Sequence, residues 1–161
     1  MPEFEPTHRI FVSYIDKSRE YYLARGFGNP YSWAHHTDAP FAPLARTLGA
    51  SRLALVTTAA LPGVARSNMQ VFAAPAADPP ALYTEHLSWH KTATHTNDRE
   101  SFLPLRRLDE FAAAGRIGSA SPRFYGVPTV YSQRRTIEEF APAVLSLCRA
   151  DSVEAALLFP L

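Results

Sequence analysis

The stretch that most constrains the fold is the last one, SVEAALLFPL, which ends at Leu161. From residue 153 to 159 apolar side chains occupy both odd and even positions, including the neighbours Leu157 and Leu158. A strand that is apolar on both sides is typical of a parallel sheet covered on both faces. We therefore expect residues 153–159 to form a buried core strand, which requires crossover connections elsewhere in the chain.

The remaining periodic segments favour the same fold class. Residues 51–61, SRLALVTTAAL, read as a second strand that leads into a Pro-Gly turn. Helical patterns occur in residues 16–29, 104–118 and 136–150, and glycines follow the first two. The order of strands and helices predicts one α/β domain over residues 1–161, with an open, mostly parallel sheet, flanking helices and an apparent truncation after a core strand.

Local signals in two segments give more detailed expectations. Thr136 and Glu139 have the spacing of a capping box, which predicts that the last helix begins at Thr136. Pro142 lies inside the helical pattern and should kink or restart the helix. Cys148 falls on the apolar stripe of that helix and is expected to be a buried, inert thiol. The proline-rich segment 68–83 is expected to be a loop.

Composition excludes several classes of protein. A net charge of +1 over 161 residues provides no basic field for nucleic acid. A single cysteine excludes an internal disulfide framework and a multi-cysteine zinc site, so a reducing cytoplasm is expected. The start of the chain lacks the features of a secretory signal, and no apolar run is long enough to span a bilayer. No glycine-rich phosphate cradle is found, so a nucleotide cofactor is not indicated.

Polar residues at the end of the first strand are candidates for substrate binding. Thr57 and Thr58 end the strand RLALVTT at its carboxyl end, the edge where open α/β sheets bind ligands. Their hydroxyls could contact a carboxylate or an amine, or could only bond the local backbone. Arg123 could hold a substrate carboxylate through a bidentate contact, or could be a solvated surface arginine.

Histidines and a carboxylate are concentrated in the segment EHLSWHKTATHTND. His86, His90, His95 and Asp98 form the densest set of potential metal ligands, and imidazole with carboxylate suits zinc or iron. The alternative is an exposed polar loop whose histidines only form hydrogen bonds. Substrate contact or proton transfer by these residues is a further alternative.

Several stretches together resemble a known family. They are residues 14–60, with YID, YYLARG, PYSWAH, D-x-PF-x-PL and RLALVTTA; residues 102–126, with PLRRL, GRIG and SPRFYG; and residues 138–161. In this order they are similar to the glycine/sarcosine/betaine reductase selenoprotein B family, which includes the D-proline reductase subunit. The likeness covers nearly the whole chain. His35 lies in the segment that matches best, so the resemblance makes it a candidate for shaping the substrate pocket.

The resemblance implies where the reactive residue should be. In that family, the strand similar to AALLFPL is followed at once by a redox selenocysteine, or often by cysteine in smaller relatives. A loop between a strand end and a helix N-terminus lowers the pKa of such a group and exposes it. We therefore expect no catalytic residue in this chain and the nucleophile just after Leu161. A UGA selenocysteine codon read as a stop would explain this boundary; a split gene or a trimmed domain is the alternative.

The function implied by the resemblance is reductive cleavage of a C–N bond in a small amine or amino acid. A partner subunit with a pyruvoyl group, a thioredoxin-type electron donor and a homo-oligomer are the expected partners, without nucleic acid or membrane. A non-catalytic module that binds a small ligand or a partner on the same scaffold is the alternative. A histidine-based metalloenzyme with a divalent metal at His86, His90 and His95 is a third reading.

Overall fold

The central element of the fold is β1 (Arg52–Thr57), which pairs with three other strands of one five-stranded sheet. The computed structural model describes residues 14–28, 34, 37–38, 42–64, 68–82, 92, 96–130 and 132–160. The other strands are β2 (Phe72–Pro75), β3 (Ser119–Ala120), β4 (Arg123–Gly126) and β5 (Ala155–Phe159). The helices are α1 (Tyr14–Ala24), α2 (Leu105–Ala113), α3 (Gln133–Arg135) and α4 (Ala141–Ala150), with 3₁₀ turns η1 (Leu48–Ala50) and η3 (Arg99–Ser101) and the π-helical turn η4 (Thr136–Phe140).

The strand pairing confirms the predicted fold class. β3, β4 and β5 each run parallel to β1, and β2 runs antiparallel to β4. Val56 pairs with Tyr125 of β4 and with Leu158 of β5, so these two strands lie on opposite sides of β1. The chain between β4 and β5 therefore crosses over β1 through α3, η4 and α4, as parallel strands require. The result is an open, mostly parallel α/β sheet.

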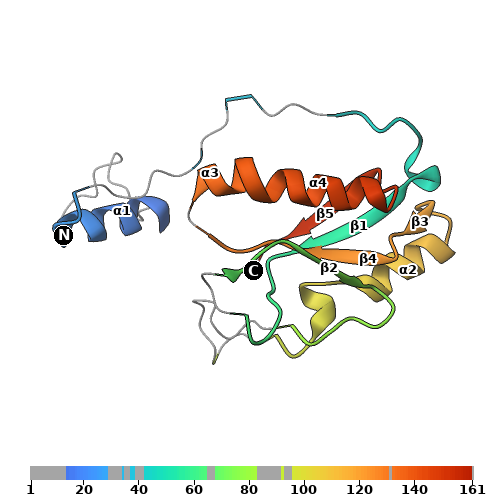
Figure 1. The fold of residues 1–161 in the computed structure, drawn as a ribbon, viewed down its shortest axis with the longest axis horizontal. Helices are drawn as coiled ribbons and strands as arrows, with labels where there is room; N and C mark the ends of the chain where they lie inside the picture. The colour runs from blue at the N-terminus through green and yellow to red at the C-terminus, as the bar shows by residue number, and fades with distance from the viewer. Residues whose placement is uncertain are drawn as a thin grey trace, which may run out of the picture. The chain divides into compact units, whose positions relative to one another are not determined.

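Two hydrophobic clusters meet at β1, one on each face of the sheet. Leu53 and Leu55 belong to the cluster that contains Phe102, Leu103 and residues of α2. Ala54 and Val56 belong to the cluster that contains Tyr125 of β4 and Cys148 of α4. Figure 1 shows α2 and α4 on opposite sides of the sheet. The alternation of side chains along one strand thus supplies both layers of the core.

The last strand is present, but the prediction that it is buried on both faces is wrong. Leu157 is 46% exposed and Leu158 is 72% exposed. Neighbouring side chains of a strand point to opposite faces, so each face of β5 has an exposed leucine, although Ala155 and Phe159 pack partly against the cluster of Leu53 and Leu55. The reason is its place beside β1 at the rim of the described sheet. Residues of α4 such as Val144 pack with Ala54, Val56 and Tyr125 of β1 and β4 instead.

Two other local predictions are also wrong. Segment 68–83 is not entirely a loop, because β2 forms within it and pairs with β4. The last helical region starts before Thr136: Ser132 is the N-cap residue, and its hydroxyl accepts a hydrogen bond from the N–H of Arg135 at 3.2 Å. The Thr136 hydroxyl donates to the Ser132 carbonyl instead of capping a helix start.

Pro142 is expected to kink or restart the last helix, and the π-helical turn η4 lies just before it. Pro142 has no N–H to donate, and its ring would crowd the carbonyl of the residue four positions earlier. Just before it, the N–H of Ala141 bonds to the Thr136 carbonyl, five residues back. This wider turn separates the α-helical hydrogen bonding of α3 from that of α4, which restarts with proline in its first turn.

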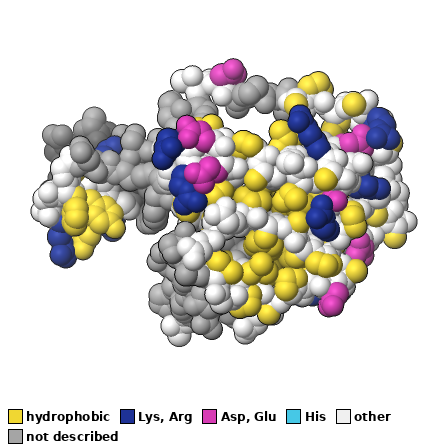
Figure 2. Space-filling model, in the orientation of Figure 1, with side chains coloured by type: hydrophobic (Ala, Val, Ile, Leu, Met, Phe, Trp, Pro, Cys, Tyr) yellow, Lys and Arg dark blue, Asp and Glu magenta, His cyan; other side chains and the backbone are white. Residues whose placement is uncertain are grey.

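The chain divides into two units, Met1–Ala39 and Pro40–Leu161. The first contains α1, which is followed by Gly26 at a φ of 80°, a conformation that favours glycine. Exposed hydrophobic side chains form a cluster on this unit (Figure 2), in which the rings of Tyr22 and Phe27 pack edge to face. The sheet lies in the second unit, and one domain over residues 1–161 stays a prediction. No helix in the described ranges is long and apolar enough to cross a lipid bilayer.

Gly118 is a point where the second unit tolerates no side chain. Its N–H donates to the carbonyls of Leu48 and Ser51, which brings its Cα against the chain that enters β1. A Cβ at this position would lie 2.6 Å from the carbonyl carbon of Ala50. Because that neighbour is backbone, it cannot rotate away as a side chain would.

We predict that Gly118→Ala lowers the free energy of unfolding by about 1–3 kcal/mol, the usual cost of overpacking. The measurement is urea denaturation followed by circular dichroism. Gly49→Ala is the matched control, because a Cβ there meets only the Gly115 carbonyl oxygen at 3.4 Å. Equal stability of the two variants would contradict the prediction.

Candidate functional site

The carboxyl ends of three parallel strands lie at one edge of the sheet. Thr57 is in register with Gly126 of β4 and with Phe159 of β5. The pairing of β1 and β4 continues one residue further, where the N–H of Val127 donates to the Thr57 carbonyl at 2.9 Å. Open α/β sheets bind ligands at this edge, so we take it as the candidate site.

An apolar pocket of about 180 Å³ is located at this edge. Its walls come from three segments: residues 59–61 and 64 after β1, residues 68–72 leading into β2, and residues 127–128 after β4. These residues are mainly aliphatic, with the Phe72 ring as the aromatic member and the amides of Asn68 and Gln70 as the polar ones. The arrangement suits the apolar part of a small ligand.

The predicted site residue Thr57 does not line this pocket but is buried behind it, where it contacts the pocket residue Ala59. Its side chain is only 1% exposed, and its hydroxyl accepts a hydrogen bond from the N–H of Ala59 at 3.2 Å. This bond turns the chain out of β1 and places Ala59, a pocket residue. The neighbouring Thr58 is half-buried. Direct contact of either hydroxyl with a ligand stays a prediction.

One wall of the pocket depends on a close contact between β2 and β4. Phe72 pairs with Gly126, and a Cβ at Gly126 would overlap the Phe72 ring. Phe72 also packs edge to face against the buried Phe124, with 6.2 Å between ring centroids. Glycine at position 126 therefore leaves the space that the Phe72 ring occupies against β4, beside the pocket.

Arg123 makes a bidentate contact, but with a residue of its own chain. Its Nε and Nη2 donate to the two carboxylate oxygens of Asp151 at 2.9 and 2.8 Å. Tyr125 donates its hydroxyl to the same carboxylate at 2.7 Å, and Arg52 donates to the Asp151 carbonyl. Because Asp151 ends α4, these bonds fix that helix to the sheet. Contact between Arg123 and a substrate would compete with this ion pair and stays a prediction.

The same network shifts the ionisation of its members. The hydrogen bond from Arg123 holds the pKa of the Asp151 carboxyl below its usual range, which keeps it charged. Burial, together with the hydrogen bond to Asp151, raises the pKa of Tyr125 to about 12. Burial also raises the pKa of the Cys148 thiol, which is 8% exposed. Cys148 is thus the buried cysteine that its place on the apolar stripe predicted, unlike a reactive thiolate.

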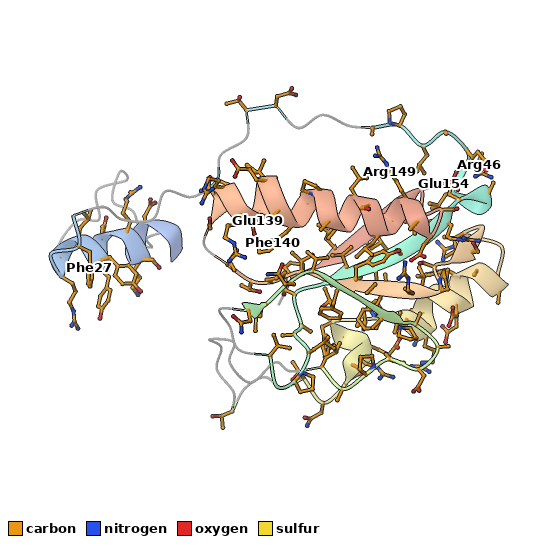
Figure 3. The ribbon with its side chains drawn as sticks, in the orientation of Figure 1. Phe27, Arg46, Glu139, Phe140, Arg149 and Glu154 are labelled. Carbon is orange, nitrogen blue, oxygen red and sulfur yellow. The ribbon has the colours of Figure 1, made fainter. Side chains whose placement is uncertain are left out.

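A second ion pair holds the start of β5. Arg46 bonds to the Glu154 carboxylate at 2.7 Å, and the other oxygen of that carboxylate accepts from the N–H of Arg52 at 3.1 Å. Figure 3 shows Arg46 beside Glu154. Both charged groups of residues 151–154 are therefore engaged at the amino end of β5, away from its carboxyl end.

The predicted metal ligands are only partly described. Asp98 caps the 3₁₀ turn η3, and its carboxylate accepts from the N–H of Glu100 at 3.0 Å. Within the described ranges, no group of three histidine, cysteine or acidic side chains is placed to hold a metal ion. His86, His90 and His95 lie outside the described residues, as does His35. The metal site stays a prediction.

The structure brings together residues that the sequence pattern did not single out. Met69, Phe72 and Val127 line the pocket, and Thr129 follows two residues later. Among the buried side-chain nitrogen and oxygen atoms of the described residues, the Thr129 hydroxyl is the one that lacks a hydrogen-bond partner. The short apolar run QVFAA was a signal for β2 and hence for this wall.

The raised pKa of Tyr125 predicts a specific loss of stability at high pH. An unfolded tyrosine ionises near pH 10, whereas folded Tyr125 keeps its proton to about pH 12. Its contribution is therefore complete below pH 10 and is lost as the pH rises toward 12.

We predict that the free energy of unfolding falls more steeply between about pH 10 and 12 in the wild type than in Tyr125→Phe, as measured by urea denaturation. The variant should also lose about 1 kcal/mol at neutral pH with the Asp151 hydrogen bond. Tyr21→Phe, at an exposed tyrosine, is the control and should keep the wild-type slope. Parallel slopes for Tyr125→Phe and the wild type would refute this role.

Comparisons with known proteins found no match for this chain. No protein-family model matches the sequence, and no curated protein and no solved structure matches it.

Proposed function

We propose that this chain is the small-molecule-binding component of a reductase of the type found in the glycine/sarcosine/betaine reductase selenoprotein B family. Its role would be to hold a small amine or amino acid at the carboxyl edge of β1 and β4. The observation that carries this proposal is the apolar pocket at that edge, lined by residues after β1 and β4 and before β2. The sequence resemblance supplies the reaction class, and the α/β sheet is the scaffold that such a site needs.

The position of β5 supports the proposal. Phe159 is level with Thr57, so β5 ends at the same edge as the pocket. A redox residue that follows this strand, as in the family resembled, would start from that edge. The one cysteine of this sequence, Cys148, is buried in the face under α4 and has a raised pKa. The nucleophile would therefore come from a residue outside this sequence.

The chemistry follows from the resemblance. A selenolate or thiolate would attack the α-carbon of the substrate, and the C–N bond would break with its electron pair leaving on nitrogen. A pyruvoyl group on a partner subunit would supply activation of the amine. A thioredoxin-type dithiol would return the electrons, which fits a cytoplasmic location. This chain's own residues would bind the apolar part of the substrate and exclude water from it.

The reductase assignment predicts what the coding DNA contains beyond the Leu161 codon. We expect an in-frame UGA or a cysteine codon directly after the Leu161 codon, followed by a reading frame similar to the family. Sequencing the genomic DNA and mass spectrometry of the native product are the measurements. A UAA or UAG codon with no related frame downstream would refute the assignment.

A second candidate function is a non-catalytic module that binds a partner, and the exposure of β5 favours it. Both Leu157 and Leu158 are exposed, and within the described sheet β5 pairs only with β1. Ala155–Phe159 contains no charged residue, whereas exposed edge strands usually carry charges that prevent pairing. A second copy of β5 in antiparallel orientation would match this strand across a two-fold axis without bringing like charges together.

This second candidate predicts concentration-dependent dimers in sedimentation velocity experiments. Leu158→Lys should shift the dimer toward monomer by at least tenfold in dissociation constant, because it places two charges at the shared edge. Leu145→Lys is the control, since Leu145 is an exposed leucine on α4. A wild-type chain that stays monomeric, or a Leu158→Lys variant that dimerises like the control, would exclude pairing through β5.

A further inference from the structure

The size and lining of the pocket at the carboxyl edge constrain what it can bind. Its volume is about 180 Å³, and Met69, Val71, Phe72, Val127 and Pro128 form much of its apolar wall. An apolar cavity of about 150 Å³ can hold a benzene ring. The pocket therefore has room for an apolar group of about five to seven carbon atoms.

From this fit we propose that the pocket selects its ligand by the apolar group, and that it takes small amines with a branched or alicyclic group of this size. One- and two-carbon amines would leave most of the wall without contacts. Each buried methylene contributes about fourfold in affinity, so cyclopentylamine, with four more carbon atoms, should bind about 250 times more tightly than methylamine. The amine part of this inference rests on the proposed function; the apolar part rests on the pocket itself.

Phe72 and Gly126 together set the size of the pocket. The ring of Phe72 lies over Gly126, where a side chain would overlap it. The fully buried Phe124 packs against the same ring, so a displaced ring would move toward the pocket. Gly126 thereby acts as a specificity-determining position although it does not line the pocket.

Met69 is a reporter for binding at this place. The sequence has two methionines, Met1 and Met69, and Met69 lines the pocket. Labelling the methionine methyl groups with ¹³C therefore gives a signal from the pocket, and the variant Met69→Leu identifies which of the two methyl signals it is. Titration with methylamine, isobutylamine, cyclopentylamine and the bulky adamantylamine measures affinity against size, and cyclopentanol tests the apolar group without the amine.

We expect the Met69 signal to shift, with affinity rising about fourfold per carbon up to cyclopentylamine and falling for adamantylamine. A Met69 signal that no ligand moves, or equal affinity across the series, overturns the inference. Equal affinity for all amines would leave the proposed function standing and remove only the size selection. Tight binding of cyclopentanol with no gain from the amine would support the apolar selection and count against the amine function.

Variants test the wall directly. Phe72→Leu should move the preferred ligand toward adamantylamine, and Gly126→Ala should weaken cyclopentylamine binding at least tenfold. If Gly126→Ala fails to fold, Val64→Phe tests the size limit instead by filling the pocket from the segment after β1, because Val64 lines the pocket and is 41% exposed. Leu145→Ala on α4 is the control and should bind like the wild type. Unchanged selectivity in Phe72→Leu and Val64→Phe would refute the assignment of this wall.

Discussion

The burial of β1 on both faces is the constraint on which the rest of the structure depends. All residues from Leu53 to Thr57 are buried, and the backbone of the strand pairs on both sides. Odd-numbered side chains supply the core under α2 and even-numbered ones the core under α4. A polar substitution at Ala54 or Leu55 would bury an unsatisfied group in one of these layers. The crossover from β4 to β5 is the connection that keeps both sides of β1 paired.

The two ends of the sheet have different chemistry. At the amino end of β5, Arg123, Asp151, Tyr125, Arg46 and Glu154 form hydrogen bonds and ion pairs that hold α4 and β5 in place. At the carboxyl end, an apolar pocket follows β1 and β4. Charged groups thus fix the scaffold at one edge, and the other edge is shaped by aliphatic contacts and the Phe72 ring. Arg123 belongs to the first of these two edges, where its ion pair with Asp151 holds the end of α4 against the sheet.

β1 and β5 show how similar sequences reach different environments. Both are short apolar strands, and their residues are paired one to one from Leu53 with Ala155 to Thr57 with Phe159. β1 lies between neighbours and under helices on both faces, whereas Leu157 and Leu158 of β5 are exposed. The exposed strand is what makes a covering partner, and hence the second candidate function, worth testing.

The sequence by itself determined the fold class and the types of the main helices and strands, but not β2. Periodicity predicted β1, α1, α2 and the last helix, and the order of elements predicted a mostly parallel sheet, because these signals are local. The buried state of Cys148 also followed from its helical stripe. Only the tertiary structure decided which strand is central, that Arg123 pairs with Asp151, and that residues after β1 and β4 meet those before β2 to form a pocket. These outcomes depend on contacts between residues far apart in the chain, which a local pattern does not encode.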